Sequence, residues 1–143
     1  MTDTEGKDKF CLIDSNIWLY AFIETQDADK SKIAKALIQQ KNSAIVISTQ
    51  IINEVCVNLV RKAHFSEEKI RELIKSFYGK YEVVGIDNEI LLRASEIREL
   101  HSYSFWDSLI LASALYADAD ILYSEDMQDG FVLEETTIVN PFK

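Results

Sequence analysis

The sequence predicts an α/β fold in which helices cover both faces of a largely parallel sheet. Short apolar runs alternate with stretches that have helical periodicity, which is the pattern of consecutive βαβ units. The apolar runs lack the polar alternation of a half-exposed strand, so both of their faces should be buried. A chain of 143 residues fits one domain, which we assign to residues 1–143 with a polar, flexible tail over residues 1–8.

Five strands and five helices are predicted in chain order. The predicted strands cover residues 10–13, 44–47, 82–86, 121–123 and 136–139. The predicted helices cover residues 29–40, 49–63, 66–79 and 88–100, and a last one begins near Asp107. Thr49 can cap the second helix, Ser66 can cap the third, and Gly79 can end the third.

The composition excludes several functional classes. The formal charge of −9 and pI near 4.7 argue against nucleic-acid binding through a broad basic surface. Two distant cysteines, Cys11 and Cys56, should be buried and reduced, and with two histidines they are too few for a typical zinc site. We see no secretory signal and no apolar run long enough to cross a bilayer, so we expect a cytoplasmic protein without membrane contact.

Four acidic residues fall where parallel strands end or where the following helices begin. Asp14 follows the first strand and Asp126 follows the fourth, while Glu54 and Asp107 lie near helix starts. In an open α/β sheet these positions share the carboxyl edge, where ligands bind. Several carboxylates at one edge repel one another unless cations lie between them, and oxygen-only ligands suit Mg²⁺ or Mn²⁺.

Each acid also has an ordinary structural explanation. Asp14 could cap the next helix, and Glu54 could be a solvated helix residue. Asp107 stands three residues after Ser104, as in a variant of a capping box, and Asp126 could be a loop residue. Only their combined placement favours a metal site.

The order of the motifs resembles that of PIN-domain ribonucleases, especially the VapC-type toxins. The resemblance rests on CLIDSNIWLYAF, STQIINEVCVNLVRK, SFWDSLILASAL and ILYSEDMQDG, and it runs from about residue 10 to residue 141. It implies a three-layer sandwich with a five-stranded parallel sheet of order 3-2-1-4-5. It also places Asp14, Glu54, Asp107 and Asp126 at the positions of the metal-binding catalytic acids, with supporting roles for Ser15, Asn16, Ser124 and, at a variable position, Asp129.

The resemblance implies a Mg²⁺- or Mn²⁺-dependent endoribonuclease that leaves a 5′-phosphate and a 3′-hydroxyl. It further implies RNA as substrate, a cognate antitoxin as partner and a homodimer. Arg61 and Lys62, at the end of the Glu54 helix, are candidate phosphate contacts or simply a solvated helix end.

Two alternatives stay open: a PIN-like binding module that cuts nothing, and another Mg²⁺-dependent α/β phosphohydrolase. A haloacid-dehalogenase-type phosphatase needs an Asp-x-Asp pair, and Asp14-Ser15-Asn16 lacks the second acid.

Overall fold

A six-stranded, mostly parallel sheet forms the centre of the protein. The computed structural model describes residues 9–40 and 43–143; the predicted tail, residues 1–8, lies outside this part of the chain. The strand order is β3-β2-β1-β4-β6-β5, and only β5 runs antiparallel to its neighbour. The strands are β1 (Lys9–Ile13), β2 (Ser43–Ser48), β3 (Glu82–Val84), β4 (Ile121–Tyr123), β5 (Val132–Leu133) and β6 (Thr136–Val139).

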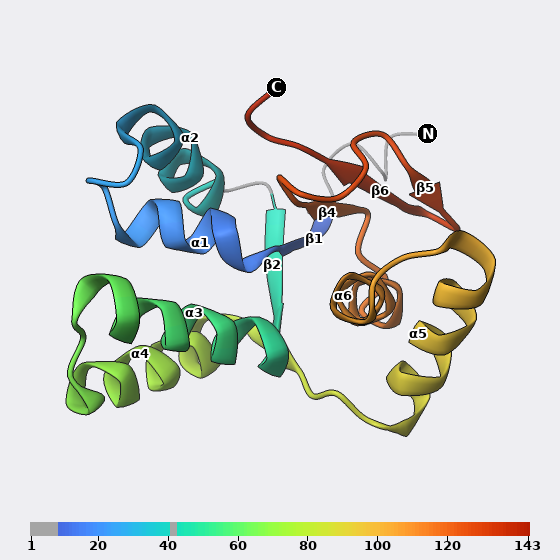
Figure 1. Ribbon diagram of the computed structural model, residues 1–143, viewed down its shortest axis with the longest axis horizontal. Helices are drawn as coiled ribbons and strands as arrows, with labels where there is room; N and C mark the ends of the chain where they lie inside the picture. The colour runs from blue at the N-terminus through green and yellow to red at the C-terminus, as the bar shows by residue number, and fades with distance from the viewer. Residues whose placement is uncertain (1–8, 41–42) are drawn as a thin grey trace.

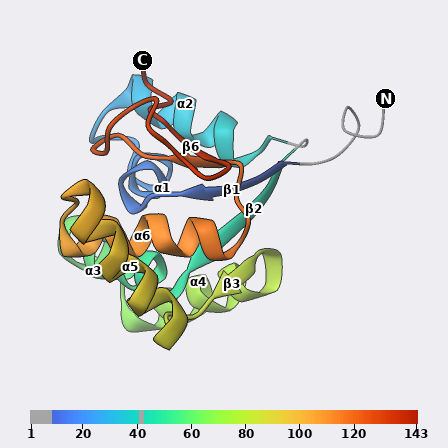
Figure 2. The same cartoon turned by 90° about the vertical axis from the view of Figure 1, so that its right-hand side faces the viewer.

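Helices flank the sheet on both sides. They are α1 (Ser15–Phe22), α2 (Ala28–Ile38), α3 (Thr49–Ala63), α4 (Glu67–Lys80), α5 (Asn88–His101) and α6 (Phe105–Tyr116). Figures 1 and 2 show α1 and α2 on one side of the sheet and α5 and α6 on the other. Because β1 pairs with both β2 and β4, the chain reverses its direction of winding at β1. This switch point lies between β1 and β4, at the sheet's carboxyl edge.

The predicted layer architecture and the order of the five predicted strands are confirmed, but the sheet has one strand more than predicted. The additional strand, β5, pairs antiparallel with β6 at the sheet edge, with Val132 opposite Thr137. Gly130, at a φ of +87°, helps turn the chain toward this hairpin, and its N–H donates to the Ile138 carbonyl. A two-residue strand is too short to produce a periodic signal.

One helix was missed and three local predictions were wrong. Helix α1 was not predicted as an element, because its mostly apolar sequence has no clear helical period. The side chain that caps α3 is Ser48 rather than Thr49; its Oγ accepts from Ile51 N at 3.2 Å. Helix α4 continues through Gly79 to Lys80, and β3 ends at Val84 rather than at residue 86.

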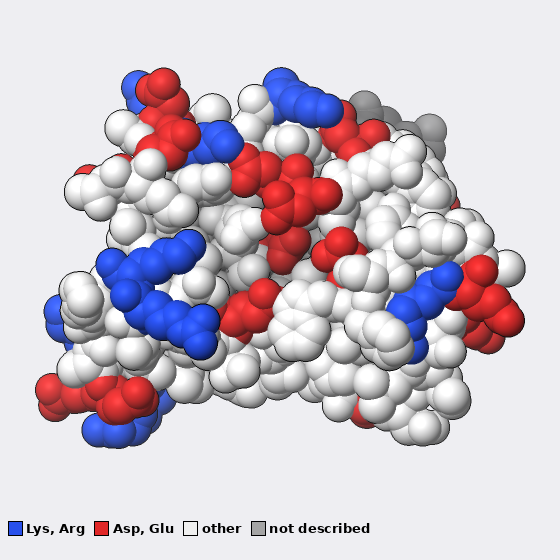
Figure 3. Space-filling model, in the orientation of Figure 1, with Lys and Arg blue, Asp and Glu red and all other residues white. Residues whose placement is uncertain are grey.

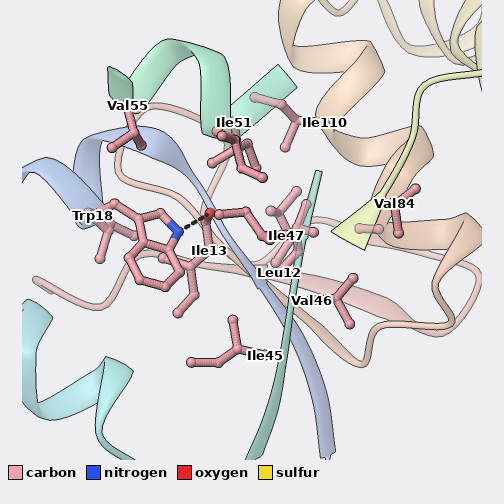
Figure 4. Close-up of a cluster of buried hydrophobic side chains, with 14 of the residues drawn as sticks. Leu12, Ile13, Trp18, Ile45, Val46, Ile47, Ile51, Val55, Val84 and Ile110 are labelled. Atoms are coloured by element: carbon pink, nitrogen blue, oxygen red, sulfur yellow. Dashed lines mark hydrogen bonds between the residues drawn. The ribbon is translucent and has the colours of Figure 1, made fainter. Parts of the chain in front are cut away.

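The core packs around Trp18, which joins α1 to the end of β1. Its indole N–H donates to the Ile13 carbonyl at 3.0 Å (Figure 4), and its ring meets the edge of Phe77 with centroids 5.2 Å apart. Trp18 is 2% exposed, so this contact fixes the first turn of α1 against β1 in a water-free setting. The start of α1 is also where Asp14 lies.

Both cysteines are buried free thiols, as predicted. Burial raises the pKa of Cys11 to about 11, which keeps the thiol protonated at neutral pH. Among the described residues, no helix is both long enough and apolar enough to cross a membrane.

Candidate active site

Asp14 is the most buried of the four acids. It is the N-cap of α1, and its N–H donates to the Tyr123 carbonyl at 2.9 Å, which ties the end of β1 to the end of β4. Its side chain is 7% exposed. The Ser15 N–H donates to Asp14 Oδ1 at 2.7 Å and the Ser124 hydroxyl donates to Oδ2 at 3.0 Å. The carboxylate is therefore held between two adjacent strands.

Burial raises the pKa of Asp14 despite these two donors. The hydrogen bonds from Ser15 and Ser124 lower it, and the negative charges of Asp107 and Asp126 raise it again. A carboxylate that caps a helix would normally gain from its donors, so the raised pKa shows that burial and like charge outweigh them here. Capping thus explains the position of Asp14 but not its surroundings.

Glu54 lies in the second turn of α3 with one oxygen atom orphaned. Glu54 Oε1 is buried and has no hydrogen-bond partner in the part of the chain that the structure describes. Burial raises the pKa of this side chain, and Asp14 and Asp107 add to the rise; polar groups of Trp106 and Ser15 oppose it without satisfying Oε1. A solvated helix glutamate would show neither property. Glu54 is therefore exceptional among surface helix residues.

Gln50, one turn before Glu54, is a buried polar residue of α3. It is 8% exposed, and its Nε2 donates to the Trp106 carbonyl at 3.4 Å. Its Oε1 is buried and, like that of Glu54, has no hydrogen-bond partner within residues 9–40 and 43–143. Two orphaned acceptor oxygens one helical turn apart face the start of α6, a site that favours a cation or a donor.

Asp107 lies in the first turn of α6. Its N–H donates to the Ser104 hydroxyl at 3.1 Å, so the capping explanation holds for the backbone at this position. Its carboxylate is half-buried, and burial raises its pKa, with the Asp126 charge adding to the rise while Ser104 lowers it. The helix start therefore points a destabilised carboxylate toward the other acids.

Asp126 lies in the loop after β4 and is exposed. Asn16 Nδ2 donates to its Oδ2 at 2.5 Å, which links the loop to the first turn of α1. Ser124 also holds this loop, because its Oγ accepts a hydrogen bond from Met127 N at 3.3 Å. The Asn16 and Ser124 contacts give these predicted supporting residues a local structural role.

The four acids lie within range of one another's charge. Each of Asp14, Glu54 and Asp107 has its pKa raised by one or two of the other acids. Figure 3 shows acidic side chains gathered at the centre of one face, where the ends of β1 and β4 meet the starts of α3 and α6. Four segments far apart in sequence thus contribute negative charge to one place.

The donors fit a hard divalent cation in chemistry but do not form a preassembled coordination shell. All are oxygen atoms, and the orphaned Glu54 Oε1 lacks the positive partner that its burial calls for. Within residues 9–40 and 43–143, no three acidic, histidine or cysteine side chains are close enough to hold a metal ion as they stand. The cluster is defined by charge and burial.

Asp129, Arg61 and Lys62 have exposed side chains. Asp129 Oδ1 accepts from Asn140 N at 2.7 Å, so this exposed side chain braces the C-terminal segment. Arg61 and Lys62 are exposed in the last turn of α3, with Arg61 roughly 10 Å along the helix axis from Glu54. In Figure 3, basic side chains lie to one side of the acidic centre, over the α3 end of the face.

The contacts that brace the loop after β4 were not predicted from the sequence. Glu125 accepts from the Tyr20 hydroxyl at 2.9 Å and forms an ion pair with Lys30. The Lys30 ammonium also lies 5.2 Å from the Tyr20 ring centroid and 5.3 Å from that of Phe142. These partners are about a hundred residues apart in sequence, so only the fold brings them together.

Trp106 was also missed, although its position directly before Asp107 could have drawn attention to it. It lies beside Glu54 and receives the Gln50 hydrogen bond on its carbonyl. An aromatic residue in an apolar helix start looks like core, but this one is 49% exposed.

The fold matches several solved structures of low sequence identity. A toxin–antitoxin complex from Klebsiella pneumoniae is 20% identical with a TM-score of 0.69, covering 93% of this chain and 98% of that one. VapC20 of Mycobacterium tuberculosis, described as a sarcin–ricin loop cleaving toxin, is 18% identical with a TM-score of 0.64, covering 78% and 86%. VapBC2 from Rickettsia felis, bound to promoter DNA, is 20% identical with a TM-score of 0.57, covering 82% and 87%.

A search of curated protein sequences gave no match. The PIN domain family model matches residues 11–129, which include all four acids and all five residues of the β1–α1 junction from Ile13 to Ile17. This match spans well over half of the chain, and the fold agrees with it. The chain belongs to the PIN domain family.

Proposed function

We propose that this PIN domain is a metal-dependent endoribonuclease and the toxin of a toxin–antitoxin pair. The observation that carries the proposal is the cluster of four carboxylates at the sheet's carboxyl edge. Burial and like charge raise the pKa of Asp14, Glu54 and Asp107, and the buried Glu54 Oε1 has no hydrogen-bond partner among the described residues. Uncompensated negative charge of this kind is costly in a purely structural role. It is favourable where a cation binds.

Asp14, Asp107 and Asp126 would hold Mg²⁺ or Mn²⁺, with Glu54 as a further ligand or as the group that orients the attacking water. When bound, the cation supplies a lowered pKa for water and charge stabilisation at the phosphoryl oxygens. Ser124 and Ser15 orient Asp14 and favour its ionised form through their hydrogen bonds. Asn16 orients the Asp126 carboxylate through a hydrogen bond.

Hydrolysis by water would leave a 5′-phosphate and a 3′-hydroxyl, without using the RNA 2′-hydroxyl as nucleophile. Both histidines support this choice over acid–base catalysis by imidazole. His64 caps the end of α3, ten residues beyond Glu54 and about 15 Å from it along the helix axis. His101 ends α5, and its ring packs edge-to-face with Phe131, with ring centroids 5.3 Å apart. Arg61 and Lys62 remain candidates for weak phosphate contacts beyond the acids.

An antitoxin partner, a homodimer and a cytoplasmic location are parts of the same proposal. The similarity to chains from toxin–antitoxin complexes supports the first two. A gene for a small DNA-binding protein next to the gene for this chain, and co-purification of the two products, would be the direct check.

Incubation of RNA with Mn²⁺ and either the wild type or Asp107→Asn tests the activity. We expect cleavage by the wild type, products with 5′-phosphate ends, and loss of at least about 100-fold in rate for the variant, since one charged ligand is lost. Chelation should stop the reaction, and Mg²⁺ or Mn²⁺ should restore it. Glu72→Gln, on the exposed surface of α4, is the control.

Cleavage that persists unchanged in Asp107→Asn would contradict the assignment of the site. Binding of Mn²⁺ to the wild type without any cleavage of RNA would instead favour the catalytically silent binding module. Turnover of a phosphomonoester in place of RNA would favour another phosphohydrolase.

A further inference from the structure

Two consecutive aromatic side chains are exposed beside the acidic cluster. Phe105 is 72% exposed and Trp106 is 49% exposed, and they open α6 directly before Asp107. Single exposed apolar residues are ordinary on protein surfaces. Adjacent large aromatic side chains at the edge of a candidate active site indicate a surface that binds a ligand. The middle of α6 instead buries Ile110, Leu111, Ala112 and Ala114 in the core.

Contacts with the body of the protein hold both aromatic residues in place. Gln50 Nε2 donates to the Trp106 carbonyl, which connects this residue to the helix that carries Glu54. The Arg98 guanidinium lies 3.8 Å from the Phe105 ring centroid, and Arg98 Nη1 donates to the Ser108 hydroxyl at 2.9 Å. A cation therefore covers one face of the Phe105 ring, which leaves the ring exposed elsewhere.

The charge of the chain restricts how it can hold a polyanion. With a formal charge of −9 and four carboxylates gathered at the site, long-range electrostatics oppose the approach of RNA. Stacking of a base on an aromatic ring needs no positive charge, and each stacked base contributes substantially to affinity. Aromatic rings accompanied by an arginine are the usual means of holding unpaired nucleotides.

We propose that Phe105 and Trp106, with Arg98, form a stacking platform for unpaired bases of the RNA next to the scissile phosphate. The proposal rests on the RNA-cleaving function proposed above and adds a subsite to it. It makes single-stranded or looped RNA the preferred substrate, because bases within a duplex cannot leave the stack to reach the platform without unpairing.

Tryptophan fluorescence measures this contact apart from catalysis. The chain has two tryptophans; Trp18 is 2% exposed, so quenching by a ligand reports on Trp106. The probe is a four-nucleotide single-stranded RNA in EDTA, compared with an oligomer of the same length whose nucleotides lack bases. We expect quenching by the first and none by the second. Equal quenching by both, or by neither, would overturn the proposal.

Cleavage kinetics with Mn²⁺ supply the second measurement. Phe105→Ala and Trp106→Ala should each raise KM for single-stranded RNA by roughly 5- to 100-fold. Trp106→Phe should recover most of the loss, since it keeps a stacking ring, and the affinity for Mn²⁺ should stay unchanged in Phe105→Ala. Tyr116→Ala is the matched control: this aromatic residue is 50% exposed at the opposite end of α6.

The same variants separate the platform from its alternatives. An unchanged KM in both alanine variants overturns the platform while leaving the nuclease intact. A shift from dimer to monomer in sedimentation, with KM unchanged, assigns the surface to contact between two copies of the chain and also overturns it. If the wild type cuts no RNA, the proposed nuclease function fails. The fluorescence experiment is made without catalysis, so it still tests the stacking platform separately.

Discussion

The Ser124 hydroxyl donates to Asp14 Oδ2 at 3.0 Å, across the switch point between β4 and β1. Ser124 is 0% exposed and Asp14 is 7% exposed, so water competes little for this contact. The same hydroxyl oxygen accepts from Met127 N in the loop that carries Asp126. The buried Ser124 hydroxyl therefore orients Asp14, directly after β1, and holds the loop that carries Asp126.

Ser124→Ala should weaken both the fold and the site. The variant leaves Asp14 with one donor fewer in a buried position, which costs about 1–3 kcal/mol in free energy of unfolding. It should also raise the pKa of Asp14 further and lower the affinity for Mn²⁺. Urea unfolding at neutral pH and Mn²⁺ titration measure the two effects. Ser113→Ala is the control, because its hydroxyl donates to the Leu109 carbonyl within α6; equal loss of Mn²⁺ affinity in both variants would contradict the prediction.

The metal-free protein should become less stable as the pH rises from mildly acidic to neutral. Asp14, Glu54 and Asp107 have pKa values raised by burial and like charge, so the folded state binds protons more tightly than the unfolded chain does. Their stabilising contribution is complete below the ordinary carboxyl pKa and is lost as the pH passes through the raised values. Thermal melts in EDTA between about pH 5 and pH 8 measure this slope.

Excess Mg²⁺ should flatten or reverse that slope, because the cation binds the ionised carboxylates and stabilises them at neutral pH. Identical slopes with and without Mg²⁺ would argue against a metal site in this cluster.

The general plan of the fold could be predicted from sequence because each buried strand is a short apolar run. The runs at Cys11–Ile13 and Ile45–Ile47 are buried in the sheet, and their alternation with helices fixed the parallel topology. Helix α1 was not predicted because its own residues Ile17, Trp18 and Leu19 are all buried. Consecutive buried residues leave no alternation of apolar and polar positions with helical spacing. Strand β5 escaped because long-range pairing, rather than local propensity, makes it a strand.

The positions of the acids could be predicted, whereas their environment could not. The rule that ligands lie beyond the carboxyl ends of parallel strands identified the positions of Asp14 and Asp126. Burial of Gln50 and the orphaned oxygen of Glu54 depend on how α3 meets the start of α6, which no local pattern encodes. The exposure of Trp106 is unexpected for the same reason.

Glu54→Gln should stabilise the metal-free protein while it removes activity. A neutral amide of the same shape takes a negative charge away from Asp14 and Asp107. Because the side chain is partly solvated, the gain in free energy of unfolding should be small, a few tenths to about 1 kcal/mol. Melts in EDTA and cleavage assays with Mn²⁺ measure the two effects. Glu72→Gln, on the exposed surface of α4, is the control. A destabilised Glu54→Gln variant would show that the carboxylate is a structural group.

Tyr20→Phe should loosen the loop after β4 without unfolding the protein. The Tyr20 hydroxyl and the Lys30 ammonium both hold the Glu125 carboxylate, and Glu125 directly precedes Asp126. Loss of one hydrogen bond to a carboxylate at this half-buried position costs about 1 kcal/mol.

The larger effect should be on the site, because Glu125 anchors the backbone directly before Asp126. With that anchor weakened, the orientation of the Asp126 carboxylate depends mainly on its hydrogen bond from Asn16. We expect faster amide hydrogen exchange over residues 124–131 and a several-fold lower affinity for Mn²⁺, with the exchange of β1 and β2 unchanged. Tyr78→Phe, at a tyrosine that is 55% exposed on α4, controls for loss of a phenol. Unaltered exchange in the loop would mean that Lys30 alone is sufficient to hold Glu125, and Lys30→Met should then produce the effect that Tyr20→Phe did not.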